Sequence, residues 1–246
     1  PIEGFIGKRR SAFEPDRDMY KVDMGDNGRY LELQLSGIRN MDLFVDVLDT
    51  GGRPITRVNY DGTGQPESLH RLRVPGREVI LVVSEFKAPE LRPTENVSDR
   101  YKLLATIKDS LDERGEVEPN DTPAAANAFT AGAQITGYLD GVRDVDYFRV
   151  STDGVMDLRR WEVAVEAEGS LVPRISIFRV TGEEPLEVFS DEGHSGLLRT
   201  VYEEPAFLNP EYLLAVSHAG RGDRRGAYKL VADLLPPKPR IAHEPN

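Results

Sequence analysis

Apolar and polar residues alternate along much of the chain, and the alternation has a period of two. Between Leu31 and Leu35 three leucines alternate with glutamate and glutamine, and between Trp161 and Val165 large apolar residues alternate with Glu162 and Ala164. Because successive side chains of a β-strand point to opposite faces, this pattern predicts half-buried strands. Similar runs predict further strands at 43–47, 79–83, 174–180 and 212–217.

Glycine and proline separate these runs. The chain contains 22 Gly and 17 Pro, which recur roughly every eight to fifteen residues and leave no room for long helices. Short strands at this spacing are typical of an antiparallel β-sandwich. The predicted fold class is therefore all-β.

The second half of the chain repeats the first. Asp16–Val22 corresponds to Asp144–Val150 at an offset of 128 residues, and Tyr101–Leu103 corresponds to Tyr228–Leu230 at an offset of 127. Segments 1–6, 30–35 and 78–83 correspond in the same way to 134–139, 160–165 and 211–216. A nearly constant offset over so many segments predicts two tandem copies of one sandwich.

The repeat also predicts where the copies begin and end. The predicted divisions are a first sandwich at 1–109, an acidic linker and opening segment at 110–121, a second sandwich at 116–236 and a proline-rich linker at 237–246. The first copy starts at a point equivalent to about residue 134, so we expect that its N-terminal segment is missing from this sequence. Glu244–Asn246 repeats Glu118–Asn120 at a spacing of 126 residues, which predicts the start of a third copy.

Charge and composition exclude several classes of protein. The chain carries 31 Lys+Arg and 42 Asp+Glu, for a net charge of -11, and has no cysteine. An acidic chain lacks the basic face that nucleic-acid phosphates require, and without thiols it can form neither disulfides nor thiolate metal sites. No apolar run is long enough to span a membrane, and any signal peptide is expected outside this sequence.

One set of motifs resembles a known family. Glu116-x-Glu118-Pro-Asn-Asp-Thr122 is followed by an alanine-rich turn, by Ile135-x-Gly-Tyr-Leu139 and by Asp144-x-Asp-Tyr-Phe-x-Val150. In order and spacing these motifs resemble the bacterial pre-peptidase C-terminal domain, which is related to the collagen-binding domains of collagenases. The resemblance is close over 116–235 and looser over 1–109. It implies jelly-roll-like β-sandwiches that act as accessory modules of secreted or cell-surface bacterial proteins.

The resemblance also implies a calcium site. Carried over residue by residue, its ligands in the second copy are Glu116, Glu118, Asn120, Asp121, Asp144 and Asp146. The first copy retains only Asp16 and Asp18, which predicts at most a partial site there. Carboxylate and amide oxygens are the ligands that Ca²⁺ takes.

A structural role is the alternative for the same residues. Asp121-Thr122-Pro123 is also a good start for a short helix, and Asp144 and Asp146 are also typical turn residues. The sequence leaves the metal site and this structural role open.

Residues of known catalytic motifs do not come together in the sequence. The four histidines, His70, His194, His218 and His243, are scattered, and we expect each of them in a surface or loop position. Gly193–Gly196 departs from the nucleophile elbow because its second glycine comes one place too early, and it predicts a β-turn instead.

We therefore expect a non-catalytic accessory or binding module of an exported bacterial protein. It would be stabilised by calcium and would bind a protein or polysaccharide partner as a secreted, periplasmic or outer-surface protein. The alternative is a purely structural spacer or assembly subunit of a larger periplasmic or cell-surface complex. A hydrolase is the third and least supported hypothesis.

Overall fold

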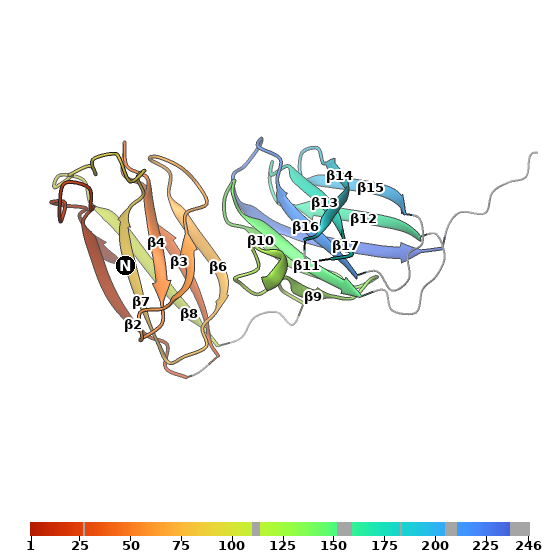
Figure 1. Cartoon of the computed structure of the whole chain (residues 1–246), viewed down its shortest axis with the longest axis horizontal. Helices are drawn as coiled ribbons and strands as arrows, with labels where there is room; N and C mark the ends of the chain where they lie inside the picture. The colour runs from red at the N-terminus through yellow and green to blue at the C-terminus, as the bar shows by residue number, and fades with distance from the viewer. Residues whose placement is uncertain (27, 110–113, 152–158, 183, 205–210, 237–246) are drawn as a thin grey trace, which may run out of the picture. The chain divides into compact units, whose positions relative to one another are not determined.

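The computed structural model describes residues 1–26, 28–109, 114–151, 159–182, 184–204 and 211–236. The chain divides into two compact units (Figure 1). Unit 1 comprises Pro1–Pro119 with Asp140–Asp144, and unit 2 comprises Asn120–Leu139 with Val145–Asn246. Both units are built from sheets whose strand pairs are antiparallel except for β9 and β11 in unit 2, so the predicted all-β sandwich class is confirmed. The predicted linker residues 110–113 and the predicted third-copy segment 237–246 lie outside the described residues.

Unit 1 is a sandwich of two four-stranded sheets. Its strands are β1 (Ile2–Gly4), β2 (Arg17–Asp23), β3 (Tyr30–Leu35), β4 (Leu43–Leu48), β5 (Pro54–Val58), β6 (Glu67–Arg73), β7 (Glu78–Glu85) and β8 (Tyr101–Lys108). One sheet has the order β1-β8-β3-β6 and the other has the order β2-β7-β4-β5. Every pair of neighbouring strands in these two sheets is antiparallel.

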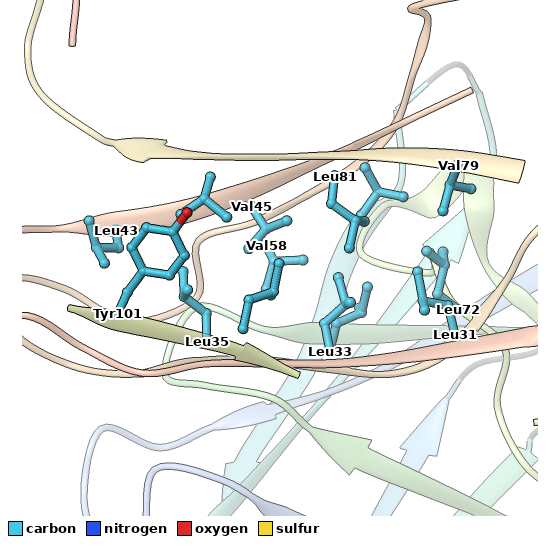
Figure 2. Packing of buried hydrophobic residues seen from close by; sticks show 14 of the residues in the cluster. Leu31, Leu33, Leu35, Leu43, Val45, Val58, Leu72, Val79, Leu81 and Tyr101 are labelled. Atoms are coloured by element: carbon cyan, nitrogen blue, oxygen red, sulfur yellow. The ribbon is translucent and has the colours of Figure 1, made fainter. Parts of the chain in front are cut away.

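The core of unit 1 follows from the alternation in the sequence. In β3 the side chains of Leu31, Leu33 and Leu35 are buried, whereas Gln34 between them is exposed. Figure 2 shows the three leucines facing Leu81 and the other apolar residues of the opposite sheet. Burial of a leucine side chain stabilises a fold by about 1.5–3 kcal/mol, so this interleaved layer holds the two sheets together.

Unit 2 has the same arrangement with two additions. Its elements are the 3-10 helix η1 (Pro123–Ala125) and the strands β9 (Asn127–Phe129), β10 (Gln134–Leu139), β11 (Val145–Ser151), β12 (Arg159–Ala167), β13 (Pro173–Val180), β14 (Leu186–Glu192), β15 (Leu197–Glu204), β16 (Glu211–His218) and β17 (Gly226–Leu235). One sheet has the order β10-β17-β12-β15 and the other the order β9-β11-β16-β13-β14. Strands β10 to β17 thus take the positions of β1 to β8, and η1 and β9 are additional.

The predicted strands are present with small differences at their ends. The runs at 43–47, 79–83, 174–180 and 212–217 lie in β4, β7, β13 and β16, and the runs starting at Leu31 and Trp161 lie in β3 and β12. Each unit also contains an equivalent side-chain hydrogen bond between a tyrosine and an aspartate. The Tyr101 hydroxyl donates to Asp18 Oδ2 over 2.5 Å, and the Tyr228 hydroxyl donates to Asp146 Oδ2 over 2.6 Å.

The predicted turn at Gly193–Gly196 joins β14 to β15. His194 and Leu197 form an antiparallel bridge, and the two residues between them, Ser195 and Gly196, have φ angles of 39° and 82°. Two consecutive positive φ angles are the geometry of a tight hairpin turn whose twist matches that of the strands. The motif is therefore a hairpin and not a nucleophile elbow.

Candidate metal centre

The first part of the candidate centre is the acidic opening segment, which lies along β6 in unit 1. The Glu118 N–H donates to the Arg71 carbonyl, and the Arg73 N–H donates to the Glu118 carbonyl, both over 3.2 Å. These bonds make a parallel bridge between Glu118 and Leu72. Glu116 and Glu118 are 1% and 2% exposed, so the segment holds two carboxyl groups out of water.

A basic side chain accompanies this segment. Arg71 sits at an irregularity of β6 and has a φ of 58°, a left-handed conformation that is uncommon for residues with a side chain. Its guanidinium fills the space in which a Cβ at Gly115 would lie, so a side chain at position 115 would collide with it. Glycine at this position leaves room for a positive charge beside the start of the acidic segment.

The second part is the segment Asp140–Asp144, which also belongs to unit 1. Asp140 is fully buried, and it accepts hydrogen bonds from the Ser68 hydroxyl over 2.8 Å and from the His70 N–H over 2.6 Å. Its Oδ1 also lies 2.5 Å from Nδ1 of His70. The Asp140 N–H in turn donates to Asp144 Oδ2 over 2.5 Å. Asp140 therefore ties this segment to β6.

Asp140 and His70 were missed in the sequence. His70 lies on β6 with a side chain that is 20% exposed, so its predicted surface or loop position is wrong. The Ser68 hydroxyl donates to Asp140, whereas a nucleophilic serine would donate to a base such as imidazole. Nothing local in the sequence indicates this cluster, because Asp140 is 70 residues from His70.

Two further predicted ligands, Asn120 and Asp146, belong to unit 2 and lie at or near the start of β11. Asn120 is fully buried, and its backbone carbonyl accepts a hydrogen bond from the Tyr147 N–H over 3.1 Å. Asp146, next to Tyr147, is also fully buried and accepts the hydrogen bond from Tyr228. Asp121 is partly exposed. Five of the six predicted ligands are thus buried, and Asp121 is the exception.

The structural alternative applies to some of these residues only. A short helix does follow Asp121, but it is a single 3-10 turn with proline in its first turn, and the Thr122 side chain at its N-cap does not cap it with a hydrogen bond. Asp144 lies in a turn, with its N–H donating to the Gly141 carbonyl. Asp146 lies in β11, so a turn role for it is wrong. A turn or cap therefore does not account for the burial of Asp146.

In unit 1, Asp16 and Asp18 serve the fold around them. Asp16 accepts hydrogen bonds from the N–H groups of Gly7 over 2.7 Å and Arg17 over 2.9 Å. Asp18 accepts from the hydroxyl of Tyr101, which also lies 2.6 Å from the Tyr20 hydroxyl. Burial, and then the hydrogen bond to Asp18, raise the pKa of Tyr101, so this hydroxyl stays protonated as a donor. Both carboxylates thus have partners within the fold.

The chemistry of the buried acids suits a hard cation. Within the described residues, Glu116, Glu118 and Asp146 are the acidic side chains that could together serve as ligands of a metal ion. Oxygen donors without His or Cys are the set that Ca²⁺ prefers. A buried carboxylate is costly unless its charge is compensated, and a divalent cation supplies that compensation.

The remaining described histidines support turns. His218 Nδ1 accepts a hydrogen bond from the Gly220 N–H over 2.8 Å, and its Nε2 lies 2.8 Å from the Asp223 carbonyl oxygen. His194 lies in the exposed hairpin turn. His194 occupies the predicted loop position, whereas His218 is the partly exposed last residue of β16, and His243 lies outside the described residues.

Comparison with known proteins finds likeness in structure only. No protein-family model matches the chain, and no curated protein matches it. The pre-peptidase C-terminal domain of collagenase from Bacillus anthracis is similar over 46% of this chain and 100% of that chain, with 17% identity and a TM-score of 0.36. The CUB1-EGF-CUB2 region of human MASP-1/3 is similar over 94% of this chain and 100% of that chain, with 13% identity and a TM-score of 0.26. At such scores neither likeness adds to the argument from the residues.

A search for membrane-spanning helices gives a negative result. In the part of the chain that the structure describes, no helix has the length and apolar content needed to cross a bilayer.

Proposed function

We propose that the chain is a non-catalytic binding module of an exported bacterial protein and that calcium stabilises it. The observation that carries this proposal is the burial of acidic side chains, with Glu116, Glu118, Asp144 and Asp146 each at most 2% exposed. Such a set would cost several kcal/mol if its charges were left uncompensated. A bound divalent cation would turn that cost into a ligand-dependent gain in stability.

Proximity along the chain supports a shared site. Glu118 and Asn120 are two residues apart, as are Asp144 and Asp146. Within unit 2, the backbone bond from the Tyr147 N–H to the Asn120 carbonyl holds Asn120 beside the start of β11. The proposed calcium ligands are Glu116, Glu118, Asn120, Asp121, Asp144 and Asp146. Asp16 and Asp18 are proposed only as part of a second site that would need further donors.

Exposed apolar side chains favour a binding module over a spacer. Phe13 and Leu91 are 57% and 53% exposed, and they lie in two loops of unit 1 that contact each other. The contact is a hydrogen bond of 3.2 Å from the Arg9 N–H to Glu95 Oε1. Contiguous exposed apolar patches mark interaction sites, and we propose that Phe13 and Leu91 belong to one. We propose a protein or polysaccharide partner at the bacterial surface or in the periplasm.

Calcium dependence can be tested by thermal unfolding of the whole chain. The protein is measured after chelation, then with millimolar CaCl₂, and with MgCl₂ as a control. A ligand at a hundred times its dissociation constant stabilises the folded state by about 2.7 kcal/mol, which raises the midpoint by several degrees. We expect this rise with calcium only.

Two variants make the test specific. Asp146→Asn keeps an oxygen that can accept from Tyr228 but removes the charge, and we expect it to abolish the calcium-dependent rise. Asp191→Asn changes an exposed acid on β14 and should leave the rise intact. If calcium leaves the midpoint of the unaltered chain unchanged, the metal proposal is wrong and a metal-free structural spacer becomes the better reading.

A further inference from the structure

One end of unit 1 carries a pocket of about 600 Å³. Strand β7 runs antiparallel to β2 and β4, so its first residue, Glu78, lies opposite Asp23 at the end of β2, and Asp49 follows the end of β4 nearby. These three residues line the pocket together with the turn that joins β6 to β7. The volume lies within the range of small-molecule sites, which is about 300–1,000 Å³.

The pocket does not lie where unit 2 carries its additional strand. In unit 2, β9 pairs with β11 on the side away from β16. Strands β11 and β16 correspond to β2 and β7, and the pocket extends from Asp23 on β2 past β7 to Ile55 on β5, toward the opposite edge of the sheet. A strand added to β2 as β9 is added to β11 would therefore lie on the other side of β2 from the pocket.

Arg77, in the turn that lines the pocket, is held in place by the loop after β2. The Met24 N–H donates to the Arg77 carbonyl over 2.7 Å, and Arg77 Nε donates to the Gly25 carbonyl over 2.6 Å. Among the described residues, no hydrogen-bond acceptor pairs with the two terminal nitrogens of Arg77. The guanidinium therefore keeps fixed N–H donors available to a ligand.

Asp49 is held in a similar way by the hairpin between β4 and β5. Its Oδ1 accepts hydrogen bonds from the N–H groups of Gly51 over 2.8 Å and Arg53 over 2.9 Å. Within the described part of the chain, its Oδ2 has no donor. The pocket thus offers a fixed acceptor as well as fixed donors.

The mixture of groups disfavours ligands that carry a net charge. The carboxylates of Asp23 and Asp49 repel anions, and the guanidinium of Arg77 repels cations. A hydroxyl group can both donate and accept, so neighbouring hydroxyls of one sugar ring can pair with a carboxylate and with a guanidinium. Ile55 and Pro75 also line the pocket, and their apolar surface suits the C–H face of such a ring.

We propose that this pocket binds a sugar ring of a neutral polysaccharide. Ring hydroxyls donate to Asp49 Oδ2 and accept from the terminal nitrogens of Arg77. Because both groups are already oriented by the backbone, binding requires little further ordering. This inference deepens the proposed binding function by naming a polysaccharide as the partner. It does not depend on calcium, because the pocket is lined by none of the proposed calcium ligands.

The test titrates the whole chain with neutral tetrasaccharides: cellotetraose, xylotetraose, mannotetraose, maltotetraose and N-acetylchitotetraose. Isothermal titration calorimetry should show saturable binding of at least one of them, both after chelation and with CaCl₂. The affinity should change little between about 50 and 500 mM NaCl, because salt screens interactions between charges and the ligand has none.

Substitutions at the pocket locate the binding. Arg77→Ala removes the donors and should weaken binding about tenfold or more, whereas Arg221→Ala removes an exposed arginine that also donates to a backbone carbonyl and should have no effect. Thr50→Trp, at an exposed position that lines the pocket, places a bulky ring in it and should abolish binding. Thr181→Trp, at an exposed position after β13 in unit 2, is its matched control.

Three results would overturn the proposal. They are the absence of saturable binding of every tetrasaccharide, binding that Arg77→Ala and Thr50→Trp both leave unchanged, and tighter binding of tetralysine than of any tetrasaccharide. The last result would mean that the pocket selects a cationic peptide. The calcium proposal fails separately, because it is decided by the thermal midpoint and not by sugar binding.

Discussion

The hydrogen bond between Tyr228 and Asp146 is the contact whose removal tests the account of the buried acids most directly. In Tyr228→Phe, the ring is kept and the hydroxyl that donates to Asp146 Oδ2 over 2.6 Å is lost. Asp146 is 0% exposed and Tyr228 is 2% exposed, so water cannot replace the lost donor without a rearrangement. Loss of a hydrogen bond to a charged, buried acceptor costs about 2–3 kcal/mol.

The assay can be confined to unit 2. The chain has a single tryptophan, Trp161, which is fully buried in the core of unit 2 against the ring of Tyr212. Thermal unfolding followed by Trp161 fluorescence therefore reports on this unit, and the expected loss corresponds to a fall in midpoint temperature of about 6–10 °C. If Asp146 binds calcium, the loss of its orienting partner should also weaken calcium affinity about tenfold.

Unit 1 supplies the matched control. In Tyr101→Phe the equivalent hydroxyl is removed, but Asp18 is partly exposed and water can replace the donor. This variant should cost about 1 kcal/mol and should leave the Trp161 transition unchanged. A loss in Tyr228→Phe that is no larger than in Tyr101→Phe would refute the reasoning, because burial would then not set the cost.

Three further variants test other parts of the structure. Asp140→Ala removes the acceptor of three hydrogen bonds from Ser68 and His70 and should cost about 3 kcal/mol or more, measured by chemical denaturation with Asp140→Asn as the milder comparison. Phe129→Ala uncovers Phe148 and should cost about 3 kcal/mol; an unchanged Trp161 transition would show that β9 does not help to close the core. Gly222→Ala, at a φ of 85°, should lower the thermal midpoint of unit 2, because a Cβ there would collide with a backbone oxygen, and an unchanged midpoint would contradict that geometry.

The local elements could be predicted from the sequence. Alternation reports which side of a strand faces the core, and it needs no knowledge of what lies opposite, so the strands starting at Leu31 and Trp161 were predictable. The offset of the repeated segments likewise comes from the sequence alone. It placed Tyr101 and Tyr228 at corresponding positions, and both hydroxyls donate to an aspartate in the structure.

Which residues these side chains contact depends on the tertiary structure. The partners Tyr228 and Asp146 are 82 residues apart and His70 and Asp140 are 70 apart, so no local pattern can pair them. The sequence predicted six acid and amide ligands without distinguishing between them. The fold buries five of them and leaves Asp121 partly exposed. Burial, strand order and edge pairing all depend on which distant segments pack together. A pattern of neighbouring residues does not contain that information.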